Sequence, residues 1–369
     1  MPLSTSSSEW RVSPPPIDVP FDRPLPSLRF GIASVVAVLV FIGAITGWEL
    51  HWRAYGVSPS YQNSDGLWAM QRRRIDDGEG NKTVIIGSSR VLFDLQLPVW
   101  QRVLGERPIQ LALEGTSPVP FLENLADDPK FIGRLVVGVT PVLFFSAFDR
   151  RIEALKYFRN ETLSQRAGQW LSMHLIEPFF AFYGEDFALI TVLKRQAWPA
   201  RTGVLNLADV RKLSVSEADR NTHMWWKVEA DPEYQQLARK IWSDLLTLRP
   251  RPTPEEARKV HDEELERAVA AVAKLRARGV HMVFVRAPSS GIWREVEQRA
   301  FPRAENWDVL LKRTSAPGIH FEDYPELQGL TLPEWSHLSA ADAERFTEAL
   351  CRILQRDYGW SRQAAEREN

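Results

Sequence analysis

Four short apolar runs constrain the fold of this chain more than any other feature of its sequence. They are rich in Val, Ile and Leu, and each is followed at once by small, hydroxyl-bearing or turn-forming residues; the runs span residues 83–86, 108–113, 135–139 and 280–285. Runs without polar alternation are typical of strands buried on both faces, as in a parallel sheet. The sequence therefore predicts an α/β fold.

Helix signals between these runs support that prediction. Thr253 is a candidate N-cap, Glu256 completes a capping box with it, and Gly279 can end the helix just before the fourth run. A last helix is predicted to begin near Ser339, after a short fifth strand at 319–322. Helices that alternate with buried strands predict a doubly wound, flavodoxin-like parallel sheet.

Residues 150–250 interrupt this alternation with helical, aromatic-rich sequence. We expect a helical insertion between the third and fourth strands, and a lid is one role that it could have. The chain is then predicted to divide into a disordered Pro- and Ser-rich tail (1–29), a transmembrane helix (30–50), a connector (51–80), an α/β domain (81–358) and a C-terminal tail (359–369).

Residues 30–48 form a run without a single charged side chain. A helix needs ~20 apolar residues to cross a bilayer, so this run is long enough for one span. Trp48 and Trp52 lie at its far end, where indole rings favour the membrane interface. A core helix would show a polar face, and a signal peptide would have a shorter apolar run and a cleavage site. We therefore interpret the run as an uncleaved anchor.

The basic residues around this run do not decide its orientation. Arg11, Arg23 and Arg29 precede it, whereas Arg53 and residues 72–74 follow it. We favour a short tail inside the cell and the large domain outside. This topology predicts a single-pass membrane protein, with the lipid bilayer as a partner and the large domain outside the cytoplasm.

Charge and cysteine content exclude several classes of partner and site. The 46 Lys and Arg residues are balanced by 47 Asp and Glu residues, so no global basic excess points to nucleic acid. Cys351 is the only cysteine, which rules out an intrachain disulfide and a cysteine-based zinc site. It is predicted to be a small buried apolar residue. We predict no metal and no cofactor.

Two polar residues stand where chemistry is expected in a parallel sheet. Ligands bind outside the carboxyl ends of such strands, and Ser89 follows the first strand through Gly87, which permits a sharp turn. A serine becomes a nucleophile only with a base within hydrogen-bond reach. His337 is the candidate base, because it lies in a loop before the last helix and Glu334 stands three residues before it.

These features resemble the SGNH/GDSL hydrolase superfamily, whose first block is a strand ending in Gly-Asp-Ser and whose last block is Asp-x-x-His. The corresponding residues here are 87–89 and 334–337. The resemblance implies Ser89 as the nucleophile, His337 as the general base and Glu334 as the orienting carboxylate. It also implies an oxyanion hole, which is the set of donors that stabilises the negative oxygen of the intermediate, formed by Ser89, Gly115 and Thr140.

Three positions depart from the family pattern. Ser88 and Glu334 each stand where the family has Asp, and residues 138–140 read Gly-Val-Thr where the family has Gly-x-Asn. Thr140 could donate through its hydroxyl, but a lost oxyanion donor costs about 2.7–4 kcal/mol of transition-state stabilisation. The resemblance is therefore compatible with a slow enzyme.

The candidate residues also have structural interpretations. In the first alternative, the sole role of Ser89 is to cap the segment that follows it. In the others, His337 is a helix-entry residue and Asp323 takes the orienting role of Glu334. The candidate substrate contacts are Arg90, Arg286 and Trp335. For each of the two arginines, the alternative is a structural ion pair.

An anchored SGNH-like domain with a degenerate first block also resembles the periplasmic proteins of polysaccharide O-acylation, such as the alginate acetylation proteins. This resemblance implies a serine esterase or O-acyltransferase that acts on acyl esters of a cell-envelope polysaccharide through an acyl-enzyme. It implies a multipass membrane O-acyltransferase as a partner. The alternative is an inactive SGNH-fold module that binds or assembles such a complex.

Overall fold

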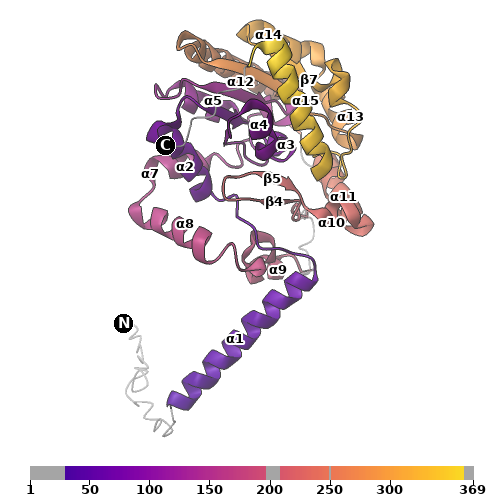
Figure 1. The fold of residues 1–369 in the computed structure, drawn as a ribbon. Helices are drawn as coiled ribbons and strands as arrows, with labels where there is room; N and C mark the ends of the chain where they lie inside the picture. The colour runs from indigo at the N-terminus through magenta and orange to yellow at the C-terminus, as the bar shows by residue number, and fades with distance from the viewer. Residues whose placement is uncertain (1–29, 197–207, 249–250, 361–369) are drawn as a thin grey trace, which may run out of the picture. The chain divides into compact units, whose positions relative to one another are not determined.

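The computed structural model (Figure 1) describes residues 30–196, 208–248 and 251–360. The tail predicted at 1–29 lies outside them, as do residues 361–369 of the tail predicted at 359–369, whereas Trp360 is described and is buried. The chain divides into two compact units, Met1–His51 and Trp52–Asn369. Helix α1 (Phe30–Ala54) is long and apolar enough to cross a membrane, and none of its residues is buried. A core helix of a soluble protein would be mostly buried, whereas a signal sequence would meet the same criteria of length and composition.

Five parallel strands form the central sheet, in the order β2-β1-β3-β6-β7. Their bounds are β1 Thr83–Ile86, β2 Ile109–Gln110, β3 Arg134–Gly138, β6 His281–Arg286 and β7 Gly318–His320. The predicted α/β fold with a parallel sheet is therefore confirmed. The fifth strand ends earlier than predicted, because the His320 imidazole accepts a hydrogen bond from the Glu322 backbone N–H at 3.2 Å and starts a 3₁₀ turn.

Helices cover both faces of this sheet, which explains why its strands lack polar alternation. One face packs Val84 and Leu135 into a core with helices α5 (Val119–Ala126), α12 (Pro254–Ala277) and α14 (Trp307–Thr314). The other face packs Ile85 and Val136 against helices α3 (Ser89–Asp94), α4 (Leu97–Leu104) and α15 (Ala340–Tyr358). Alternate residues of each strand therefore enter two different apolar cores.

The two predicted helix starts are confirmed. Thr253 and Glu256 form a reciprocal capping box at the start of α12, and Gly279, at φ +77°, follows its end. The Ser339 hydroxyl accepts the backbone N–H of Asp342 at the start of α15.

The segment between β3 and β6 is not wholly helical, contrary to the predicted insertion. Strands β4 (Ser214–Ser216) and β5 (Thr222–Met224) pair antiparallel within it. In the turn that joins them Arg220 is fully buried and donates to the carbonyls of Gln110 and Ala112, so contacts with the end of β2 stabilise this hairpin. The other elements there are α6 Pro141–Phe144, α7 Glu153–Asn160, α8 Leu163–Leu175, η2 Ala181–Tyr183, η3 Glu185–Phe187, α9 Leu189–Lys194, α10 Trp226–Ala230 and α11 Pro232–Leu248.

The remaining elements include a helix in the segment predicted as a connector. Helix α2 (Asp65–Arg74) is capped by Ser64 and continues into a π-helical turn, η1 (Ile75–Glu79), which leads to β1. After β6 come α13 Gly291–Ala300, η4 Arg303–Glu305, η5 Phe321–Asp323 and η6 Pro325–Leu327.

Candidate active site

The turn after β1 presents a serine hydroxyl at the carboxyl edge of the sheet. A Cβ on Gly87 would lie 2.2 Å from Val91 Cγ2 and 3.1 Å from Gly138 Cα, so this position tolerates only glycine. Ser88 then caps α3, and Ser89 is its first residue and half-buried. In a sheet of this strand order the crevice between β1 and β3 is where ligands bind.

Ser89, His337 and Glu334 form one continuous chain of hydrogen bonds. His337 Nε2 lies 2.8 Å from Ser89 Oγ, although the two residues are 248 positions apart in the chain. His337 Nδ1 lies 2.8 Å from Glu334 Oε1. The imidazole and the carboxylate are both buried. A hydroxyl, an imidazole and a carboxylate in this order form the arrangement in which a base can take the proton of a serine nucleophile.

Glu334 is held as an ionised carboxylate by donors on every side. The backbone N–H groups of Ser336 and His337 donate to its Oε1 at 3.3 and 2.7 Å, and the indole of Trp242 donates to its Oε2. Burial acts to raise the pKa of Glu334, but His337 and these donors outweigh it and lower the pKa. An ionised Glu334 keeps the proton of His337 on Nδ1, which leaves Nε2 free to accept the proton of Ser89.

The local backbone and a neighbouring ring fix the geometry of this relay. Trp335, between Glu334 and Ser336, has a φ of +75°, a strained conformation for a bulky residue. Phe93 stacks on the imidazole of His337 with ring centroids 4.3 Å apart. Asp323, the alternative orienting carboxylate, pairs with Arg303 at 2.7 Å instead.

A second buried carboxyl lies beside the relay. Asp94 accepts the backbone N–H of Leu338 at 2.9 Å and is fully buried. Burial raises the pKa of Asp94 well above its usual range, against the effects of Leu338 and Arg90, and Glu334 raises it further. Sequence reasoning missed Phe93, Asp94 and Trp242, although the first two stand only four and five residues after Ser89.

Replacing Trp242 by phenylalanine is expected to destabilise the protein by about 1.5–3 kcal/mol, because a buried carboxylate loses a donor. The lowered pKa of Glu334 stabilises the fold above its unfolded pKa of about 4.3, and this contribution is lost as the pH falls through the folded value. In Trp242→Phe the folded pKa of Glu334 should lie closer to the unfolded value, so this loss should be smaller and should end at a higher pH. Calorimetric unfolding of the detergent-solubilised chain between pH 2 and 8 measures both effects.

Trp293→Phe is the matched control for this variant. Trp293 packs edge-on against Trp242 at 5.4 Å, but its own indole nitrogen is buried without an acceptor among the described residues. The control should therefore change stability less, and should leave its pH dependence unaltered. Equal effects of the two substitutions would contradict a special role for the bond from Trp242 to Glu334.

The three candidate oxyanion donors lie in different settings. Ser89 begins α3, so its backbone N–H is one of the amides that have no acceptor within the helix. The Thr140 hydroxyl is buried and lies 2.6 Å from the Ser88 hydroxyl. Gly115 follows β2, which lies on the opposite side of β1 from β3, and its φ is +57°. A joint role of these three residues in binding an oxyanion stays a prediction.

The two candidate substrate-binding arginines form ion pairs. Arg90 Nη2 lies 2.7 Å from Glu297 Oε1, and Arg286 binds the other oxygen of the same carboxylate. Arg90 is only 1% exposed and therefore offers no surface to a substrate in this conformation. Burial raises the pKa of Glu297, but the two guanidinium groups lower it to about 2 overall. In this structure both arginines therefore form the structural ion pairs that were the alternative to substrate binding. Trp335 is partly exposed.

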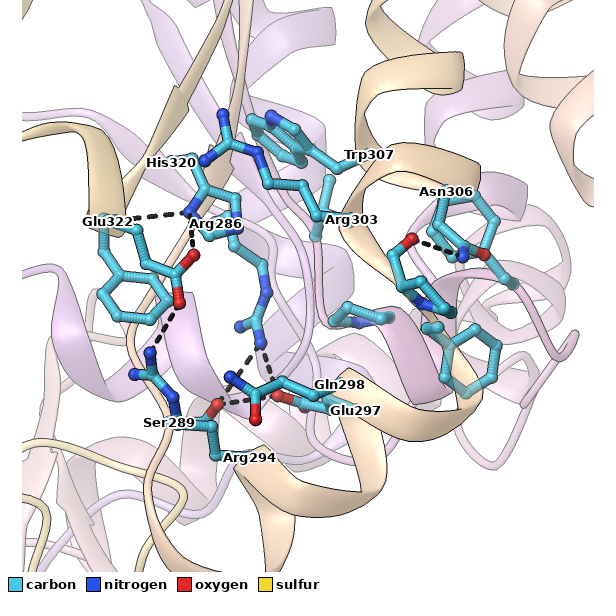
Figure 2. Close-up of a pocket in the computed structure, with 16 residues that line it drawn as sticks. Arg286, Ser289, Arg294, Glu297, Gln298, Arg303, Asn306, Trp307, His320 and Glu322 are labelled. Atoms are coloured by element: carbon cyan, nitrogen blue, oxygen red, sulfur yellow. Dashed lines mark hydrogen bonds and ion pairs between the residues drawn. The ribbon is translucent and has the colours of Figure 1, made fainter.

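A cavity of about 250 Å³ lies at the carboxyl ends of β3, β6 and β7 (Figure 2). Arg286 and Glu297 point toward each other within it, and Glu322 lies between His320 and Arg294. Its charged lining residues thus pair with one another or with near neighbours. Neither Ser89 nor His337 lines this cavity, so it is separate from the hydroxyl and imidazole of the relay.

Comparisons with known proteins do not assign a family to this site. No protein-family model matches the chain, and a search of curated proteins finds no match.

Proposed function

We propose that this chain is a membrane-anchored serine esterase or O-acyltransferase of the SGNH type. The observation that carries the proposal is the relay from Ser89 through His337 to Glu334, in which both hydrogen bonds of the imidazole are 2.8 Å long. The parallel sheet and the position of Ser89 after β1 are consistent with that superfamily. Helix α1 is the proposed anchor in the bacterial inner membrane, with the larger unit in the periplasm.

The reaction proceeds through an ester of Ser89. His337 Nε2 accepts the hydroxyl proton while Ser89 Oγ forms a bond to the acyl carbonyl carbon, and Glu334 stabilises the imidazolium that results. The bond from carbon to the leaving oxygen then breaks, and the imidazolium returns its proton to that oxygen. Attack by water completes hydrolysis, whereas attack by a sugar hydroxyl completes transfer.

The proposed substrate is an acylated polysaccharide of the cell envelope, and a multipass membrane O-acyltransferase is the proposed donor of acyl groups. Both follow from the resemblance of an anchored SGNH-like domain to the proteins of polysaccharide O-acylation.

Trapping with a fluorophosphonate tests the nucleophile directly, because this reagent phosphonylates serines that a neighbouring base activates. The detergent-solubilised chain is expected to gain one adduct, which peptide mass spectrometry should locate on Ser89. His337→Ala should prevent the reaction. A chain that keeps its circular dichroism spectrum but does not react would contradict the proposal.

The alternative function is an inactive SGNH-fold module that binds or assembles a polysaccharide-modifying complex. One observation favours it: the hydroxyl of Thr140, which stands where the family has an amide donor, lies 2.6 Å from the Ser88 hydroxyl. Whenever Thr140 is the donor of this pair, it has no proton left for a substrate oxygen. A folded, unreactive chain in the trapping experiment would support this alternative.

A further inference from the structure

An exposed apolar surface follows β3 in the second unit. Among the described residues after position 51, most of the exposed large apolar side chains lie between residues 163 and 193, and those elsewhere are Tyr55, Ile132, Trp226, Leu237 and Leu248. The side chains of this surface, which we name the α8–α9 surface, are Leu163, Trp170, Leu171, Leu175, Phe179, Phe180, Leu189, Ile190 and Leu193.

On α8 these side chains follow the period of a helix. Leu163, Trp170, Leu171 and Leu175 lie on one side and are about half or more exposed, whereas Met173 is buried. Helix α8 is also well formed, because Thr162 and Gln165 make a capping box at its start. The exposed side of α8 is therefore an apolar stripe, which a soluble protein would normally bury.

The chain itself brings this surface close to the end of the proposed anchor. Within the second unit Trp52 contacts Phe187 with ring centroids 4.6 Å apart, and Arg53 donates to the Phe179 carbonyl at 2.8 Å. Trp52 follows Trp48, the last residue of the charge-free run, by four residues. Because four residues of fully extended chain span at most roughly 14 Å, Trp48 and Trp52 lie no farther apart than this, whatever the relative placement of the two units. If the run ends at a bilayer surface, Phe179 and Phe187 lie near that surface.

Aromatic residues and charges around this point fit a membrane interface. The indoles of Trp225 and Trp226 both donate to the Gly56 carbonyl, and Lys227 Nζ lies 4.5 Å from the ring of Tyr55. Rings with one apolar and one polar end are enriched at this depth. Helices α8 and α9 contain Arg166 and Lys194 but no acidic residue, which suits anionic headgroups. Between the helices Glu177 is buried and Asp186 pairs with Arg195 at 2.6 Å, so Glu185 is the one exposed acidic side chain of residues 163–194.

We propose that the α8–α9 surface lies on the lipid bilayer, with its apolar side chains at the boundary between headgroups and acyl chains. This contact is independent of the catalytic proposal but rests on α1 as the anchor. Figure 1 shows α8 and α9 on the far side of β4 and β5 from helices α12 and α14, so the contact leaves the sheet clear of the membrane.

Spin labels in the full chain test this contact. Cys351 is buried and is replaced by alanine, and single cysteines are introduced as Leu171→Cys and Ile190→Cys, with the exposed Ile132→Cys as the matched control. The chain is reconstituted in vesicles of phosphatidylethanolamine and phosphatidylglycerol. Collision rates of each label with oxygen, which concentrates in lipid, and with a water-soluble nickel chelate are then measured.

The ratio of oxygen to nickel collisions is expected to be several-fold higher at positions 171 and 190 than at 132. Equal ratios at the three positions in vesicle-bound protein would overturn the contact and leave the anchor intact. Labels at 171 and 190 protected from both reagents would overturn it in favour of a protein partner or a second copy. A chain that fails to float with the vesicles would overturn anchor and contact together, while fluorophosphonate labelling of Ser89 would still report on catalysis.

Discussion

Replacing Ser89 by alanine is expected to lower the rate of ester cleavage by about 10⁴-fold or more, because the acyl-enzyme can no longer form. The substitution removes only a half-buried hydroxyl and its 2.8 Å hydrogen bond to His337. Its cost in unfolding free energy should therefore stay near 0.5–1.5 kcal/mol, roughly the net value of one hydrogen bond. Hydrolysis of a chromogenic acetyl ester by the detergent-solubilised chain measures the rate.

Two further variants make this result specific. Ser146→Ala removes an exposed hydroxyl that bonds only a backbone carbonyl of its own helix region, and it should leave the rate unchanged. The double variant Ser89→Ala/His337→Ala should be no slower than either single variant, because the two groups act as one unit. If the loss of rate in the double variant equals the product of the losses in the two single variants, the hydroxyl and the imidazole do not work together.

Replacing Glu334 by glutamine is expected to lower the same rate by about 10⁴-fold, by analogy with the loss of a triad carboxylate in other serine enzymes. Its two oxygens accept from His337, Ser336 and Trp242, so its surroundings consist of donors. Glutamine has only one oxygen, and its NH₂ group would face another donor. Because the site is fully buried, the variant should also lose about 1–3 kcal/mol of stability.

Asp323→Asn is the matched control, since Asp323 is the alternative carboxylate for the orienting role. It pairs with Arg303 near the surface, and such exposed pairs contribute about 0–1 kcal/mol. Its rate should match that of the unchanged chain. A Glu334→Gln chain that remains fully active would show that the carboxylate only supports the loop, and would remove the orienting role from the proposal.

Features set by neighbouring residues could be predicted from the sequence. The buried strands follow from runs of four to six apolar residues, and the capping box of Thr253 and Glu256 spans three positions. The close approach of Ser89 and His337 was also predictable, although they are 248 residues apart. Carboxyl ends of parallel strands meet at one edge, so a strand-end serine and a histidine in the loop before the last helix were expected to converge there.

Contacts between distant segments away from the carboxyl ends of the strands could not be predicted in this way. The bond from Trp242 to Glu334 joins residues 92 positions apart, and nothing near Trp242 in the sequence marks it as a donor to that carboxylate. The pairing of Arg90 with Glu297 likewise depends on where α13 lies against α3. The β4–β5 hairpin was missed because a buried arginine from its turn donates to carbonyls at and just after the end of β2, a tertiary contact that outweighs the helical pattern around it.

The sequence by itself determined the five strands of the parallel sheet, the main helix starts, the charge-free span and the two residue blocks that carry the hydroxyl and the imidazole. Periodicity and capping depend on residues two to four positions apart, so a local pattern is enough to specify them. Only the tertiary structure decided which donors surround Glu334, which arginines are consumed by ion pairs, and which apolar side chains of α8 and α9 remain outside the core. These depend on how whole elements pack, and packing is a property of the complete chain.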